Sequence, residues 1–215
     1  MLVLEGRVYL KGRFEDCSIG IEDGRIAAVK KSLRGKRHED YGGLLIVPGG
    51  IDIHVHFRDP GLTHKEDFLT GTTSAAMGGV TAVFDMPNTK PPANTLREYE
   101  SKLKGVRERA FVDFGVYAAL LKPRETSALV GAKAPFKLYM AETTGGLNVP
   151  MDDAPRLLAG IPPEYAPVVV HAEDQAKFKP FESTSLVQHN LARPVEAESS
   201  CIENPIPLLR DYRQF

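Results

Sequence analysis

PGGIDIHVHFR, residues 48–58, is the stretch of sequence that decides the fold. Successive side chains of a β-strand point to opposite faces. The apolar residues at positions 51, 53, 55 and 57 would therefore share one face, and the polar residues at positions 52, 54, 56 and 58 would share the other. The apolar context and the Pro-Gly-Gly entry predict a buried strand over Ile51–Phe57 whose polar face carries His54 and His56.

Two imidazoles on one face of a strand can reach a single metal ion, so His54 and His56 are candidate metal ligands. The alternative is a polar face on an edge strand, because His-x-His also occurs by chance. His171 follows the apolar run Val168–Val170, at the carboxyl end of a predicted parallel strand, where ligands of α/β folds collect. Taken alone, His171 is equally compatible with a core histidine that binds a backbone carbonyl.

Lys137 is the unusual residue of a second strand, FKLYM from Phe136. A buried ammonium is costly unless it is paired or neutralised. The side chain could extend to solvent at the strand end. The functional alternative is an amine with a lowered pKa. Such an amine can react with carbon dioxide to give a carbamate, whose two oxygens could bridge two metal ions.

Arg58 and Asn88 follow the first two predicted strands. A guanidinium suits a carboxylate ligand, and an amide can add a donor. The alternatives are an ion pair of Arg58 with Asp59 or Glu66, and a simple turn preference for Asn88.

From Pro48 onward, strands alternate with helices, which predicts an α/β fold with a parallel sheet covered on both faces. Residues 1–47 instead predict a small β-module of short strands broken at Gly6 and Gly12, with a solvated loop over Lys30–Asp40. The domains are therefore 1–47 and 48–215. The predicted strands of the second are Ile51–Phe57, Val80–Met86, Phe111–Ala118, Phe136–Met140 and Pro167–His171. The predicted helices are about Lys65–Met77, Leu96–Arg109, Arg124–Val130, Asp152–Gly160 and Pro194–Tyr212. A capping box at Thr63 and Glu66 would start the first helix, and Pro205 and Pro207 would kink the last.

The composition excludes several classes of protein. With 215 residues, a net charge of −1 and 42% hydrophobic residues, the chain is neither disordered nor a nucleic-acid binder that relies on positive charge. No apolar run is long enough for a membrane span, and the N-terminus does not read as a signal peptide. The two cysteines, Cys17 and Cys201, have no metal or disulfide spacing and are expected to be small buried residues. A cytoplasmic location is expected.

These motifs together resemble the dihydroorotases of the cyclic amidohydrolase superfamily. The block PGGIDIHVHFRDPGLTHKEDFLTGTTSAAMGGVTAVFDMPNT, residues 48–89, carries most of the resemblance. FKLYMAETT from Phe136, VVVHAEDQ from Val168 and RPVEAE from Arg193 follow in the family's order. The resemblance implies a (β/α)8 TIM barrel of the amidohydrolase type, with about five βα units present here, beside part of a small β-module.

The resemblance also implies an activity, the reversible cyclisation of N-carbamoyl-L-aspartate to L-dihydroorotate in pyrimidine biosynthesis. The implied cofactor is a pair of zinc ions bridged by carbamylated Lys137. His54, His56 and His171 match further metal ligands, and the family's next metal-binding histidine, on the sixth strand, would lie beyond Phe215. Arg58 and Asn88 match the residues that hold the substrate carboxylate. The implied partners, besides the substrate, are a second copy of the chain or aspartate transcarbamoylase.

The length of the chain qualifies this expectation. A barrel of this type needs about 250 residues. In the family, the catalytic aspartate lies on the eighth strand, beyond Phe215, so no catalytic residue is assigned here and a fragment is expected. The alternatives are an inactive scaffold beside aspartate transcarbamoylase, and a half-barrel completed by oligomerisation. Within the enzyme class, the alternative is an allantoinase, hydantoinase or dihydropyrimidinase, whose uncharged ring substrates do not need Arg58.

Overall fold

The computed structural model describes residues 1–162, 164–165, 167–180 and 185–203. The chain divides into two compact units, residues 1–50 and residues 51–215, which are described separately. Among the described residues, every helix is too short or too polar to traverse a bilayer. Cys17 and Cys201 are both buried free thiols, as expected.

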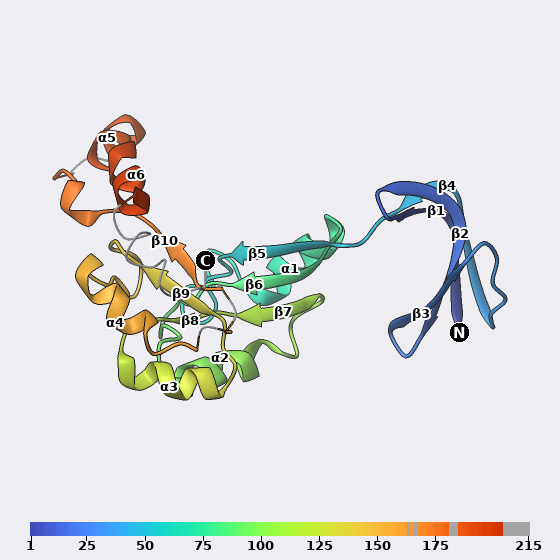
Figure 1. The fold of residues 1–215 in the computed structure, drawn as a ribbon, viewed down its shortest axis with the longest axis horizontal. Helices are drawn as coiled ribbons and strands as arrows, with labels where there is room; N and C mark the ends of the chain where they lie inside the picture. Colours follow the sequence, from blue (N-terminus) through green and yellow to red (C-terminus); the bar gives the residue numbers. More distant parts are fainter. Residues whose placement is uncertain (163, 166, 181–184, 204–215) are drawn as a thin grey trace. The chain divides into compact units, whose positions relative to one another are not determined.

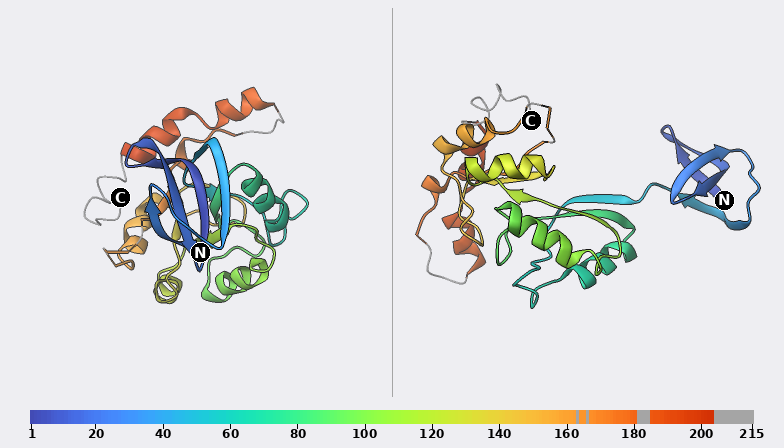
Figure 2. Two further views of the ribbon diagram at one scale, coloured as in Figure 1. Left: turned by 90° about the vertical axis from the view of Figure 1, so that its right-hand side faces the viewer. Right: turned by 90° about the horizontal axis from the view of Figure 1, so that it is seen from below.

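The first unit is a four-stranded sheet (blue in Figures 1 and 2) in the order β3-β2-β1-β4. Its strands are β1 (Leu2–Leu10), β2 (Arg13–Glu22), β3 (Arg25–Lys30) and β4 (Arg37–Ile46). The β1–β2 and β2–β3 pairs are antiparallel, whereas β1 and β4 run parallel with a bulge between Glu5 and Arg7.

Two expectations for this unit were wrong. β1 passes through Gly6 without a break, because its partner β2 continues the ladder opposite. The segment expected as a solvated loop contains the start of β4, where His38 contacts Glu5 Oε2 through Nε2 at 2.9 Å.

The second unit holds two three-stranded sheets, in the orders β5-β6-β7 and β8-β9-β10. Their strands are β5 (Gly50–Val55), β6 (Val80–Asp85), β7 (Asp113–Val116), β8 (Ala118–Ala119), β9 (Phe136–Tyr139) and β10 (Val169–His171). Tyr117 alone separates β7 from β8. The β6–β7, β8–β9 and β9–β10 pairs are parallel, which confirms the predicted α/β arrangement.

β5 is less buried than predicted. It lies at one end of its sheet, and Ile51 and Ile53 are 68% and 56% exposed. Val55 at its carboxyl end packs against the core, and Phe57, two residues beyond the strand, is 7% exposed and belongs to the core.

Helices lie between these strands and after the last of them. They are α1 (Phe68–Met77), α2 (Leu96–Val106), α3 (Pro123–Gly131), α4 (Ala154–Leu158), α5 (Leu186–Ala192) and α6 (Val195–Glu203). In Figure 1, α2 and α3 lie beside each other, in agreement with their contacts. α5 was not predicted. The rest of the predicted last helix, with its kink at Pro205 and Pro207, lies outside the described residues.

α1 begins later than the sequence suggested. Its N-cap is Asp67, whose carboxylate accepts a hydrogen bond from the Thr70 amide, so the Thr63 capping box does not form. α1 packs closely on the end of β5. A Cβ at Gly71 would lie 2.4 Å from the Phe57 ring, so only glycine fits there.

The core of this unit forms where helices and strands meet. Its buried members include Phe68, Val83, Phe136, Leu138, Leu158 and Val168. The strand ends that carry the candidate site residues are therefore anchored in a packed interior.

Candidate metal and substrate site

His54 and His56 lie on the same face of the β5 segment, as the alternation predicted. Their ring centroids are 5.3 Å apart. Burial and the positive charge of Arg58 lower the pKa of His56 to about 4. Burial and the positive charge of Lys137 lower the pKa of His54. Both imidazoles are therefore neutral at physiological pH, the form in which histidine binds a metal.

Asn88 is buried and bound to His56. Its Oδ1 lies 2.9 Å from His56 Nδ1, and its Nδ2 donates to Thr143 Oγ1 at 3.3 Å. A carbonyl oxygen beside Nδ1 favours the tautomer that leaves His56 Nε2 free for a metal. Asn88 thus orients a candidate metal ligand, a contact that its turn preference alone did not suggest.

Arg58 extends the polar face of β5 beyond the strand end. Its φ of 61° lies in the left-handed region, which is uncommon for a residue with a side chain and costs free energy. Within the described part of the chain, its guanidinium forms no ion pair, and Asp59 pairs instead with Arg109 Nη1 at 2.6 Å. The guanidinium is thus available to an anionic ligand.

Lys137 is the most unusual group of the unit. It is 1% exposed, and among the described residues its Nζ has no hydrogen-bond partner. Burial lowers its pKa to about 8. The ring of Tyr139, two residues along β9, has its centroid 5.3 Å from Nζ. Tyr139 is also buried, and its hydroxyl also lacks a partner among the described residues.

His171 ends β10, beside β9. In the parallel register it faces Tyr139, and the two ring centroids are 6.1 Å apart. His171 Nε2 lies 2.5 Å from Glu173 Oε2, and Arg193 Nη1 contacts the same carboxylate oxygen at 3.3 Å. Nδ1 of His171 therefore remains for a metal in this arrangement.

The structure brings the predicted residues together in two groups. His54, His56, Arg58 and Asn88 surround the ends of β5 and β6, and Lys137 and His171 lie on adjacent strands β9 and β10. The charges of Lys137 and His171 both act on His54. No group of three His, Cys, Asp or Glu side chains close enough for one ion occurs among the described residues.

The donor set fits a metal with a bridging carbamate. Neutral imidazoles suit zinc, and a buried amine without a partner is a group whose unmet interactions a ligand or a modification would satisfy.

Sequence reasoning missed three side chains of this region, Asp85, Lys102 and Glu173. Asp85 carried a usable signal, since it is a charged residue at the end of an apolar strand. Lys102 carried none, because a lysine in a charged helix is expected to be exposed.

Comparisons with known proteins agree with these motifs. Residues 43–138 match the family model described as dihydro-orotase-like. The chain is 37% identical to a dihydroorotase from Methanosarcina acetivorans, over 94% of this chain and 46% of that protein. A dihydroorotase from Thermococcus kodakarensis is 34% identical over 99% of this chain and 49% of its own length. The chain thus spans about half the length of the curated relatives that it matches.

Solved structures give the same fold. An L-hydantoinase (dihydropyrimidinase) from Arthrobacter aurescens superposes with a TM-score of 0.87 at 26% identity, over 98% of this chain and 51% of that one. A D-hydantoinase superposes with a TM-score of 0.82 at 23% identity, over 98% of this chain and 50% of that one.

Proposed function

We propose that the protein is a metal-dependent dihydroorotase that interconverts N-carbamoyl-L-aspartate and L-dihydroorotate, because residues 43–138 match the dihydro-orotase-like family model and nearly the whole chain is similar to curated dihydroorotases. In this proposal β5, β6, β7 with β8, β9 and β10 are the first five strands of a (β/α)8 barrel. Residues 1–47 belong to the small β-module of that architecture.

Lys137 is the observation that carries the proposal. A lysine that is 1% exposed and without a partner among the described residues has no evident structural role. With a pKa of about 8, an appreciable fraction of its amine is neutral near pH 7 and can add to carbon dioxide. The carbamate would be held with His54, His56 and His171 as ligands of two zinc ions.

When bound, the metal pair supplies a water of lowered pKa and polarises the amide carbonyl of the substrate. The chain's own residues orient the candidate metal ligands. Asn88 fixes the tautomer of His56, and Glu173 holds His171 through Nε2.

Arg58 is an argument for a substrate that carries a negative charge. Its guanidinium has no ion pair within the described residues and lies close enough to affect the pKa of His56. We propose that it binds the substrate carboxylate and places the ring amide at the metals. A hydantoinase or dihydropyrimidinase acts on an uncharged ring and has no use for this contact.

A substrate panel with the full-length protein tests the proposal. We expect turnover of dihydroorotate and carbamoyl aspartate, and little turnover of hydantoin, allantoin or dihydrouracil. Hydrolysis of hydantoins together with no hydrolysis of dihydroorotate would establish the alternative cyclic amidase. Absence of both metal and turnover, with binding to aspartate transcarbamoylase, would favour the inactive scaffold.

A further inference from the structure

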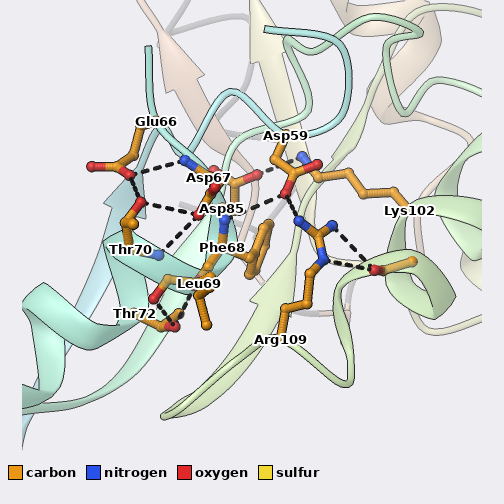
Figure 3. Close-up of polar contacts among 11 residues, drawn as sticks. Asp59, Glu66, Asp67, Phe68, Leu69, Thr70, Thr72, Asp85, Lys102 and Arg109 are labelled. Carbon is orange, nitrogen blue, oxygen red and sulfur yellow. Dashed lines mark hydrogen bonds and ion pairs between the residues drawn. The ribbon is translucent and has the colours of Figure 1, made fainter. Parts of the chain in front are cut away.

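A buried ion pair lies beside the backbone that follows β5, next to the candidate ligand His56. Asp85, the last residue of β6, is 0% exposed, and Lys102 of α2 is 4% exposed. Lys102 Nζ lies 2.5 Å from Asp85 Oδ2 and donates to the Met86 carbonyl at 2.9 Å. Figure 3 shows Lys102 reaching from α2 toward the strand ends. The pair thus ties α2 to the carboxyl end of β6.

The other oxygen of Asp85 binds the backbone of a different segment. Oδ1 accepts a hydrogen bond from the Phe57 amide at 2.7 Å. The ladder that joins β5 to β6 ends just before this point, where the Met86 amide donates to the Val55 carbonyl at 2.9 Å. Beyond the ladder, the carboxylate of Asp85 therefore replaces a strand partner for the backbone.

Phe57 separates the two candidate site residues His56 and Arg58. Fixing its amide fixes the orientation of both adjoining residues: His56 can reach Asn88, and the chain turns at Arg58 into the left-handed region. A second clamp follows immediately. Asp59 Oδ2 accepts from Arg109 Nη1 at 2.6 Å and from the Phe68 amide at 3.3 Å (Figure 3).

Stability alone does not account for an ion pair at this place. Burial raises the pKa of Asp85 and lowers that of Lys102, so each charge is maintained against desolvation by the other. Apolar residues of similar volume commonly replace such a pair at no cost in stability. They could not accept the Phe57 hydrogen bond.

We propose that Asp85, with Lys102 as its counter-ion, is a positioning residue that sets the geometry of His56 and Arg58 through the Phe57 amide. The inference rests on the proposed function only for the roles of those two residues. Asp85 touches neither substrate nor metal in this account.

Two double variants isolate the hydrogen bond from the charge. Asp85→Asn/Lys102→Met removes both charges and keeps an oxygen acceptor for the Phe57 amide. Asp85→Leu/Lys102→Met removes the charges and the acceptor together. Leu129→Ala, at a buried residue of α3, a helix that carries none of the candidate site residues, controls for lost stability. Asp85→Glu keeps the charge but displaces the carboxylate, and serves if the leucine variant does not fold.

Three readouts are compared in the full-length protein: kcat/KM for dihydroorotate, the ¹⁵N chemical shifts of the His56 imidazole, and hydrogen exchange at the Phe57 amide. We expect Asp85→Leu/Lys102→Met to lose about 100-fold in kcat/KM, with shifted His56 resonances and faster Phe57 exchange. Asp85→Glu should change in the same direction. Asp85→Asn/Lys102→Met and Leu129→Ala should stay close to the wild type in all three.

Wild-type values for the leucine double variant, or equal losses in the two double variants, would overturn the inference. A wild-type protein without turnover would refute the proposed function alone. The positioning role would then be decided by the His56 shifts and the Phe57 exchange, which require neither substrate nor metal.

Discussion

The two buried lysines of the second unit differ in one respect. Lys102 is 4% exposed, paired with Asp85 and bound to the Met86 carbonyl. Lys137 is 1% exposed, and its Nζ has no hydrogen-bond partner in the part of the chain that the structure describes. Burial lowers the pKa of both. Hydrogen bonding, rather than burial, therefore distinguishes Lys102 from Lys137, and Lys137 is the lysine for which we propose a role in binding.

The same contrast extends to tyrosines. Tyr165 donates its hydroxyl to the Ala134 carbonyl at 3.1 Å, whereas the Tyr139 hydroxyl has no partner among the described residues. Lys137 and Tyr139 lie on one face of β9, so these two unsatisfied groups lie close together.

The largest expected effect is the loss of metal on substitution of Lys137. Lys137→Met removes the amine that would become the bridging ligand and keeps much of its volume. We expect the two-metal occupancy to disappear, measured by metal analysis after gel filtration. A normal metal content in this variant would contradict the carbamate role.

Lys102→Met should act on stability. It leaves the Asp85 carboxylate charged, buried and without its counter-ion, and we expect the free energy of unfolding to fall by about 3–5 kcal/mol. Urea denaturation of the metal-free protein measures this. In the same assay Lys137→Met should be at least as stable as the wild type. Equal losses of unfolding free energy in the two variants would contradict the distinction between the two lysines.

Arg58→Ala should weaken substrate binding while the metals are retained. Loss of a charge-assisted contact worth about 1.5–3 kcal/mol corresponds to a KM raised roughly 10- to 100-fold. Steady-state kinetics with dihydroorotate, together with metal analysis, check this expectation. An unchanged KM would argue against a carboxylate partner.

The smallest effects concern the two tyrosines. Tyr165→Phe removes a satisfied hydroxyl and should cost about 1 kcal/mol of unfolding free energy, whereas Tyr139→Phe should cost nothing measurable. Denaturation of the metal-free variants under identical conditions compares them. A larger loss for Tyr139→Phe would show that its hydroxyl is satisfied after all.

Much of this arrangement could be predicted from the sequence. The alternation of His54 and His56, and the end of α1 at Met77, follow from local rules of strand geometry and helix termination. The prediction of a loop around His38 was wrong because the pairing of β4 with β1, a long-range contact, overrides local polarity. The predicted start of the first helix at a Thr63 capping box was wrong, because the Asp67 side chain caps α1 instead.

The site was predicted less completely than the fold. Lys137 was detectable because an ammonium inside an apolar strand conflicts with its surroundings. The pairing of Asp85 with Lys102 could not be detected in the sequence, because it depends on how α2 packs beside the end of β6. The bond of Asn88 to His56 likewise depends on the meeting of two strand ends.

The most direct test of the account is ¹³C NMR of the protein loaded with zinc in ¹³C-bicarbonate. We predict one carbamate resonance that persists in Asp85→Asn/Lys102→Met and disappears in Lys137→Met. Absence of that resonance from the metal-loaded wild type, or its survival in Lys137→Met, would contradict the central claim that Lys137 is completed by carbon dioxide and metal.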